Sequence, residues 1–155
     1  MAESIFLQMP RTPGPFHWLL VDALGNRIGH VQQGALSEAA AQARGRKLTA
    51  FVPGEQVLLF PAEIPTRNLQ KVQQAAPFIL EDKLAADVET LHFSAELRDT
   101  GKPLVAVTEQ DRMRHWLDEM AQAGLEPVQL VADVTALPPP PEGAVVALDA
   151  GYAVV

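Results

Sequence analysis

Short apolar runs alternate with turn residues along the first third of the chain, and this pattern predicts strands. Residues 5–9, 16–21 and 28–32 are such runs, separated by Pro/Gly residues or by Leu-Gly-Asn, and they predict a three-stranded meander. Two further runs, over residues 48–52 and 57–60, lie on either side of a Pro-Gly turn and are also expected to be strands. The chain is therefore expected to begin with a sheet.

An Ala-rich segment between these strands predicts a short helix over residues 38–44. Ser37 is expected to cap its first turn, and Gly45 occupies the position where helices commonly end in the left-handed conformation. Three basic residues lie at the negative end of this helix, where cations are stabilised: Arg44, Arg46 and Lys47.

A longer helical pattern follows a proline and is expected to begin at Thr66. Its apolar positions recur every three or four residues and predict one buried stripe: Leu69, Val72, Ala76, Leu80, Leu84 and Val88. Pro77 lies inside the pattern, has no backbone N–H and disfavours α geometry at the residue before it. We therefore expect two helical segments with a bend at Pro77.

The second half of the chain predicts a hairpin and then a helix. Residues 91–97 and 103–107 are strand-like runs that flank the turn sequence Arg-Asp-Thr-Gly-Lys. The helix is expected to start at Thr108 and Asp111, which resemble a capping box, and to stop at Gly124. Its apolar face is expected to pack into the core and comprises Met113, Trp116, Leu117 and Met120.

A strand is predicted over residues 128–132, shortly before four successive prolines. The prolines predict a stiff linker over residues 138–143. Beyond it, the run 144–148, a turn at 149–151 and the run 152–155 predict a hairpin. Because the chain ends within an apolar run, we expect it to be a fragment of a longer protein.

The order of these elements predicts an α/β fold class. Up to the prolines it is three strands, a helix, a strand, an insertion, a helix and a strand. This is the order of one half of a ribonuclease-H-like or actin-like domain, in which helices flank a mixed sheet. We expect residues 1–137 to form this domain, with a helix-hairpin subdomain inserted at about 57–108, and residues 144–155 to begin a truncated second subdomain.

Composition narrows the classes of function. The chain has 155 residues, of which 48% are apolar and 20% charged, so it is able to bury a core. Its formal charge of −7 disfavours nucleic acid and direct membrane contact and favours a basic protein partner. The absence of cysteine is typical of a reducing compartment. The sequence contains neither a signal peptide nor the ~18 successive apolar residues of a membrane span.

One stretch carries a family resemblance. Residues 75–93 read Ala-Ala-Pro-Phe-Ile-Leu-Glu-Asp-Lys-Leu-Ala-Ala-Asp-Val-Glu-Thr-Leu-His-Phe. They resemble the signature Pro-Tyr/Phe-x-x-Glu-Glu-x-Leu-Ala-x-Asp-Val-Glu-x-Leu-His of GspL, an inner-membrane protein of type II secretion systems. The matching residues are Pro77, Phe78, Glu81, Leu84, Ala85, Asp87, Val88, Glu89, Leu91 and His92. Asp82 departs from the signature, because the family more often has Glu there.

The resemblance implies an actin-like cytoplasmic domain that recruits the secretion ATPase GspE by binding its N-terminal domain. Such a domain is an adaptor rather than an enzyme, and it lies on the cytoplasmic side of the bacterial inner membrane. In the family it is followed by one membrane helix and a periplasmic domain. The resemblance also implies GspM and GspF as partners of the full-length protein, and it leaves self-association open.

The expected partner-binding surface combines acidic and apolar residues of this stretch. Residues 81–99 carry a local charge of −4. Apolar anchors surrounded by charge favour steered association with another protein. The candidate partner-binding residues are Phe78, Glu81, Asp82, Leu84, Asp87, Glu89, Leu91, His92 and Phe93. The alternative is that the acidic residues merely solvate a helix and the apolar ones fill the core.

No cofactor, metal or catalytic site is expected. An actin-like phosphate loop would follow the first strand as Asp-x-Gly-Thr/Ser, whereas residues 10–15 contain three prolines and no Asp. The pairs Glu89/His92 and Asp111/His115 have the spacing of metal ligands but lack the further ligands that a site requires. No serine lies in a Gly-x-Ser-x-Gly motif.

Two classes of function therefore compete. The first is the secretion adaptor. The second is an actin-like nucleotide-binding scaffold resembling the pilus assembly protein PilM, or a sugar-kinase-like phosphotransferase. A partial phosphate loop at residues 149–152 is interpreted as a turn. Thermal stabilisation by a nucleotide would distinguish the second class from the first.

Overall fold

The computed structural model describes residues 3–98, 102–127, 129–137, 146–149 and 152–154. The chain divides into two compact units. The first unit comprises residues 1–54 and 119–155, and the second comprises residues 55–118. Each unit has a sheet of its own. The predicted linker at 138–143 lies outside the described residues.

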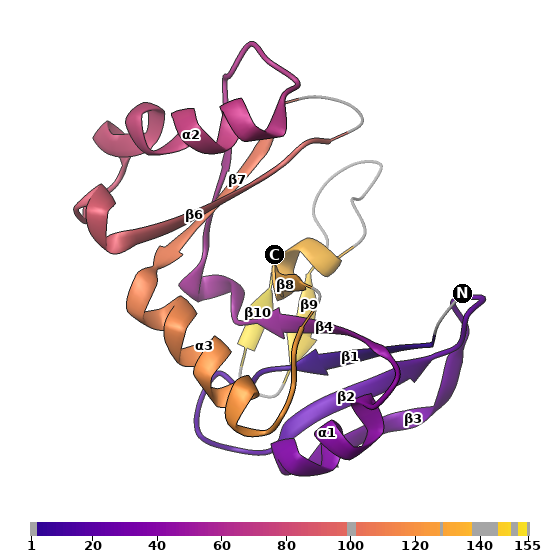
Figure 1. Ribbon diagram of the computed structural model, residues 1–155. Coiled ribbons are helices and arrows are strands. Elements are labelled where there is room, and N and C mark those ends of the chain that lie inside the picture. Colours follow the sequence, from indigo (N-terminus) through magenta and orange to yellow (C-terminus); the bar gives the residue numbers. More distant parts are fainter. Residues whose placement is uncertain (1–2, 99–101, 128, 138–145, 150–151, 155) are drawn as a thin grey trace. The chain divides into compact units, whose positions relative to one another are not determined.

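The first unit is built on a five-stranded mixed sheet (Figure 1). Its strands are β1 (Ser4–Gln8), β2 (Phe16–Val21), β3 (Arg27–Gly34), β4 (Lys47–Val52) and β8 (Gln129–Ala132). Their order in the sheet is β3-β2-β1-β4-β8; the first three pair antiparallel, and β4 pairs parallel with both β1 and β8. This is the strand order of a ribonuclease-H-like half, so the predicted α/β fold class is confirmed.

Alternation of side chains along the strands defines the buried face of this sheet. Ile5 and Leu7 of β1 are fully buried, and their partners in register on β4, Leu48 and Ala50, are buried as well. Residues in register lie on the same face, so these four form one apolar layer. Helix α1 (Leu36–Ala43) contacts β1 and β2 through a side that includes the fully buried Ala39.

Helix α1 begins earlier than predicted, and Ser37 is not its cap. Ala35 occupies the N-cap position, and its N–H donates to Glu38 Oε2 at 3.3 Å. Ser37 lies inside the first turn, and the Glu38 side chain accepts the backbone N–H of the N-cap residue instead. Gly45 has a φ of 75°, as the predicted helix end requires, and Arg46 donates to a carbonyl of the last turn at 2.6 Å.

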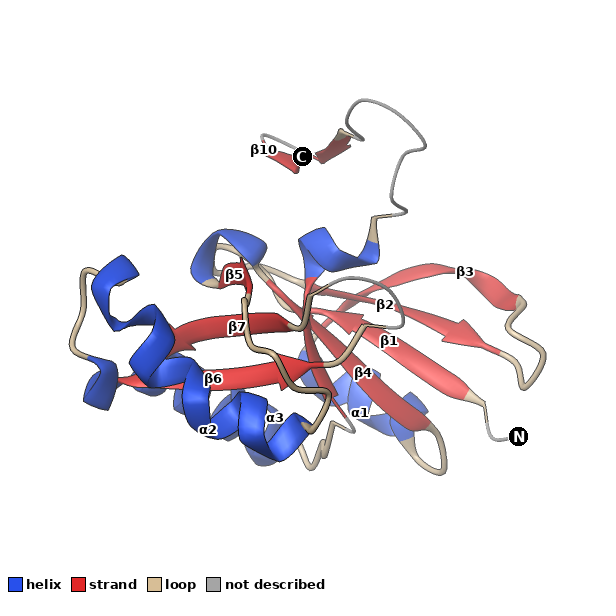
Figure 2. Cartoon of the chain, turned by 90° about the horizontal axis from the view of Figure 1, so that it is seen from above, coloured by secondary structure: helices blue, strands red, loops and turns tan. Residues whose placement is uncertain are grey.

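The second unit has a three-stranded antiparallel sheet in the order β5-β7-β6. Its strands are β5 (Leu58–Pro61), β6 (Leu91–Glu96) and β7 (Leu104–Glu109). Strands β6 and β7 confirm the predicted hairpin, whose turn at residues 99–101 lies outside the described residues. Helix α2 (Leu69–Leu80) packs against β6, and both ribbon views show it alongside that strand (Figure 2).

The core of the second unit lies between α2 and the sheet. It consists of Ala62, Val72, Ala76, Leu80, Leu91, Phe93, Val105 and Val107. The predicted stripe of α2 is therefore buried at Val72, Ala76 and Leu80. Leu84 and Val88 lie beyond the helix and are only partly buried against this core.

Helix α2 differs from the prediction at its start and at its proline. Thr66 precedes the helix, and Asn68 is the cap, because Asn68 Oδ1 accepts a backbone N–H of the first turn at 3.1 Å. The helix continues through Pro77 as one element, so the prediction of two helical segments is wrong. Ala76 and Leu80 continue one buried stripe across the proline, and their burial offsets the single hydrogen bond that Pro77 removes.

Helix α3 (Gln110–Gln122) also begins without the predicted cap. Thr108 lies in β7, and its hydroxyl donates to the carbonyl of Gln56 at 2.8 Å. Asp111 pairs with Arg114 on the helix surface. Gly124 ends the helix as predicted, with a φ of 74° and its N–H donating to a last-turn carbonyl at 2.9 Å. Of the predicted apolar face, Trp116 and Met120 are buried, Met113 is half-buried and Leu117 is exposed.

The C-terminal region contains β9 (Ala147–Asp149) and β10 (Tyr152–Val154), which pair antiparallel as predicted. Residues 150 and 151 of the predicted turn lie outside the described residues. Short 3₁₀ turns are η1 (Gly54–Gln56), η2 (Glu81–Lys83), η3 (Val88–Thr90) and η4 (Asp133–Ala136). Among the residues that the structure describes, no helix is long and apolar enough to span a membrane.

Candidate partner-binding surface

The segment with the family resemblance runs from the last turn of α2 through η2 and η3 into β6, entirely within the second unit. Val72, Ala76 and Leu80 occupy the buried side of α2. Phe78 therefore faces outward, and 81% of its surface is exposed. A large exposed aromatic side chain is the residue type that anchors protein interfaces.

Exposed carboxylates follow Phe78 along the chain. Glu81 and Asp82 form the start of η2, one helical turn beyond Phe78, and both are exposed. Asp87 and Glu89 are exposed as well. Asp87 also has a structural task, because its Oδ1 accepts the N–H of Glu89 at 3.0 Å at the start of η3.

The remaining predicted residues divide between the core and the surface. Leu91 and Phe93 are each only 8% exposed and belong to the core of the second unit. Leu84 is half-buried against that core. His92 alternates with its neighbours along β6 and is exposed. The predicted set is thus split, with Phe78, the carboxylates and His92 presented to solvent.

A groove that the sequence did not predict adjoins this segment. Its volume is about 270 Å³, and Leu84 and Leu91 line it together with Leu58 of β5. Leu58 is 54% exposed at the start of an edge strand. Glu55, Glu109 and Arg112 also line the groove, and Arg112 forms an ion pair with Glu109 at 3.6 Å, so charged groups of both signs adjoin its apolar surface. The pairing of β5 with β7, which brings Leu58 here, is not visible in the sequence pattern.

The other candidate chemistry has structural explanations. Residues 10–15 follow β1, where an actin-like phosphate loop would stand, and Arg11 there forms an ion pair with Asp133. Asp133 also accepts the N–H of Gly54 at 2.9 Å, so this carboxylate joins three segments of the first unit. Within the described part of the chain, no group of three or more metal-ligating side chains comes together.

Comparison with known proteins identifies relatives over most of the chain. The family model "Type II secretion system (T2SS), protein L" matches residues 13–152. A relative from Pectobacterium carotovorum, named type II secretion system protein L, is 28% identical over 134 residues, which cover 84% of this chain and 32% of the relative. A protein of the same name from Dickeya chrysanthemi is 33% identical over 88 residues, which cover 57% of this chain and 22% of that protein.

A solved structure shares the fold. It is the cytoplasmic domain of EpsL, an inner membrane component of the type II secretion system of Vibrio cholerae. The two match with a TM-score of 0.73 and 24% identity, over 91% of this chain and 61% of that domain. The chain spans about a third or less of the length of these curated relatives. Since the family model covers nearly all of the sequence, the chain belongs to the type II secretion system protein L family.

Proposed function

We propose that this chain is a non-enzymatic adaptor of type II secretion that docks the secretion ATPase GspE on the cytoplasmic side of the inner membrane. The observation that carries the proposal is Phe78, an aromatic side chain 81% exposed and followed within one turn by two exposed carboxylates. Contacts with GspM and GspF belong to the proposal only for the full-length protein.

The chemistry of the surface defines the partner. An aromatic anchor gains most when it enters a pocket that excludes water. The carboxylates around Phe78 accelerate the approach of a positively charged surface and suppress acidic competitors. The partner surface is therefore expected to be basic at its rim and apolar at its centre.

The groove beside Leu84 and Leu91 offers a second apolar contact. A volume of about 270 Å³ has room for one or two apolar side chains of the partner. In this arrangement Leu84 and Leu91 contribute by lining the groove, while Phe93 supports it from the core. Glu81, Asp82 and Glu89 provide the charged rim.

Calorimetric titration of this chain with the N-terminal domain of GspE tests the proposal. We expect saturable one-to-one binding, weakened roughly 30-fold by Phe78→Ser, as for an interface hot spot. The matched control is Leu24→Ser, because Leu24 is 82% exposed in the turn between β2 and β3. This control is expected to leave the affinity unchanged.

Charge reversal tests the rim separately. Glu81→Lys and Glu89→Lys are expected to slow association and to reduce its dependence on salt. Glu126→Lys, at an exposed position after α3, makes the same change in net charge outside this segment. If Phe78→Ser and both charge reversals bind the GspE domain with the affinity of the native chain, the docking surface lies elsewhere. Absence of binding together with nucleotide-dependent thermal stabilisation would favour the nucleotide-binding scaffold instead.

A further inference from the structure

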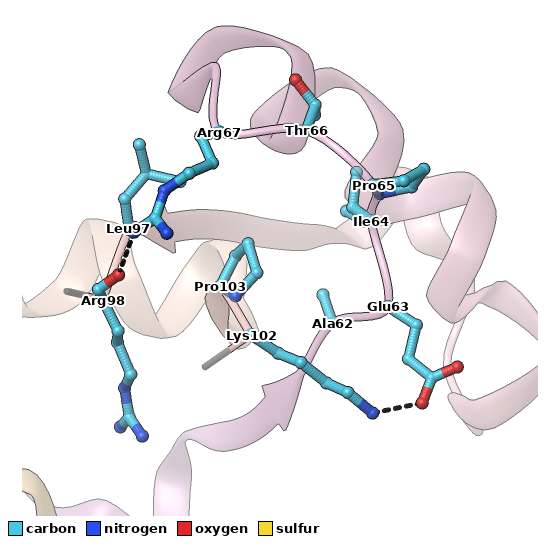
Figure 3. Close-up of a pocket in the computed structure, with 10 residues that line it drawn as sticks. All are labelled: Ala62, Glu63, Ile64, Pro65, Thr66, Arg67, Leu97, Arg98, Lys102 and Pro103. Carbon is cyan, nitrogen blue, oxygen red and sulfur yellow. Dashed lines mark hydrogen bonds and ion pairs between the residues drawn. The ribbon is translucent and has the colours of Figure 1, made fainter. Parts of the chain in front are cut away.

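A pocket of about 700 Å³ opens in the second unit where β5 ends (Figure 3). It is lined by residues 62–67, which connect β5 to α2, by Leu97 and Arg98 just after β6, and by Lys102 and Pro103 just before β7. None of these residues belongs to the proposed GspE surface. The pocket is therefore a separate feature, and the ligand that its chemistry selects is independent of GspE docking.

The lining of this pocket combines apolar surface with positive charge. Its apolar residues are Ala62, Ile64, Pro65, Leu97 and Pro103. Its charged residues are Arg67, Arg98, Lys102 and Glu63. Among the described residues of the lining, the formal charge is thus positive, in a chain whose net charge is −7. At physiological salt charges are screened within about 8 Å, so a bound group senses this local excess rather than the net charge.

Hydrogen bonds within and between the lining segments fix their positions. The N–H of Ala62 donates to the carbonyl of Pro103 at 2.8 Å, and Arg67 Nη2 donates to the carbonyl of Arg98 at 2.7 Å. The N–H of Thr66 donates to a carbonyl two residues earlier at 2.8 Å. A pocket that is already formed binds with less loss of conformational entropy.

The acidic residue in the lining does not cancel its positive charge. Glu63 pairs with Lys102, and hydrogen bonding from Lys102 followed by its charge lowers the pKa of Glu63 below 4.5. The carboxylate thus stays ionised and pairs with one of the cations, Lys102. Both side chains are more than half exposed, so the pair is weak and Lys102 is able to turn to an incoming carboxylate.

We propose that this cationic pocket binds an acidic, extended segment of a partner protein. Carboxylates of the segment would meet Arg98 and Lys102, and an apolar side chain between them would enter the space above Ile64 and Leu97. The apolar lining favours a peptide over a small inorganic anion, because an anion would leave that surface uncovered. The concave shape favours a peptide over a lipid surface, whose headgroups would reach only the rim.

The test is fluorescence anisotropy with a labelled peptide, Glu-Leu-Glu-Glu-Leu-Glu, titrated with the chain at low salt. We expect saturable binding that Gln-Leu-Gln-Gln-Leu-Gln does not show. The double variant Arg98→Gln/Lys102→Gln is expected to weaken binding about tenfold, as two partly exposed ion pairs would. Arg27→Gln, an exposed position of β3 in the first unit, controls for lost charge and is expected to change nothing.

Circular dichroism and the thermal midpoint establish that the double variant is folded; both substituted residues are exposed. Equal binding of the Glu and Gln peptides, or of the native chain and the folded double variant, would overturn the proposal.

A second experiment measures binding of the chain to vesicles of phosphatidylglycerol and phosphatidylcholine. Vesicle binding that depends on Arg98 and Lys102, without peptide binding, would also overturn it by assigning the pocket to anionic lipid.

Discussion

The side-chain amide of Gln73 donates to the carbonyl of Phe93 and accepts the N–H of Ala95 at 2.8 Å. It thus takes the place that a peptide group of another strand would occupy beside β6. Gln110 Nε2 donates to the carbonyl of Leu91 at 3.2 Å and continues this protection. Unpaired strand edges are templates for pairing with other chains, so these two glutamines close the outer edge of the sheet.

Replacing Gln73 is therefore expected to destabilise the second unit. Gln73→Ala leaves a half-buried carbonyl and a half-buried N–H without this partner, which costs about 1–3 kcal/mol of unfolding free energy. Urea denaturation measures this loss. Gln74→Ala removes an exposed glutamine from the same helix turn and is expected to change stability by less than about 0.5 kcal/mol. Equal effects of the two substitutions would contradict this role of Gln73.

A second prediction concerns pH and the turn between β2 and β3. The backbone N–H of Asn26, followed by its side-chain amide, lowers the pKa of Asp22 below 3.8. Asp22 Oδ1 accepts the N–H groups of Leu24 and Asn26, both at 2.8 Å. Because the folded pKa is depressed, the stabilisation is fully present above pH 3.8 and is lost as pH falls through the folded value.

Thermal midpoints of the native chain and Asp22→Ala test this linkage between pH 7 and pH 3. The native chain is expected to melt at a higher temperature at neutral pH, and the difference is expected to shrink below pH 3.8. Asp118→Ala removes an exposed carboxylate of α3 and serves as the comparison. A difference that stays constant down to pH 3 would mean that the ionised form of Asp22 is not the stabilising one.

At the scale of elements, the strands were predictable because short apolar runs are separated by turn residues. Ile5, Phe6 and Leu7 of β1 form one such run, whereas the burial of Ile5 and Leu7 with Phe6 only half-buried became apparent from the structure. Gly45 and Gly124 mark helix ends because a positive φ is required there. The pairing of distant segments, such as β5 with β7, is set by tertiary packing and left no mark in local sequence.

The starts of the helices were not predictable, because several residues compete for one cap. Ser37, Thr66 and Thr108 are all suitable caps by residue type. Ser37 is displaced because Glu38 bonds the preceding backbone, and Thr108 because strand β7 extends past it and Gln56 accepts its hydroxyl proton. In the candidate surface, Leu91, His92 and Phe93 alternate along β6, so that Phe93 is buried on the side that packs against α2 and His92 is exposed.

Pro77 allows a prediction for helix α2. The helix continues past this residue although no N–H is available there for the carbonyl one turn earlier. Pro77→Ala is expected to restore that hydrogen bond and to raise the unfolding free energy by about 1–2 kcal/mol, after the greater freedom of the unfolded chain is subtracted. Urea denaturation at constant m-value tests this. A loss of stability would show that the proline ring contributes necessary packing beside Ala76.

At the scale of the whole molecule, both proposed surfaces lie in the second unit. Phe78 and the carboxylates that follow it belong to residues 55–118, and so does the cationic pocket. This unit is continuous in sequence and has its own sheet, helix and buried cluster. Both proposals therefore place the recognition chemistry of this chain in the second unit.

The last prediction is that residues 55–122, which keep α3 whole, fold and bind the GspE N-terminal domain on their own. So small a core gives a marginal stability, and the isolated unit is therefore expected to unfold at lower urea than the full chain. Its affinity for GspE is expected to lie within about threefold of the full chain's, a difference of roughly 0.6 kcal/mol. Dispersed amide resonances would establish folding, and calorimetry the affinity. If the isolated unit folds but fails to bind, contacts essential for GspE binding lie in the first unit. The affinity of Phe78→Ser in the full chain would then show whether the aromatic side chain contributes to binding.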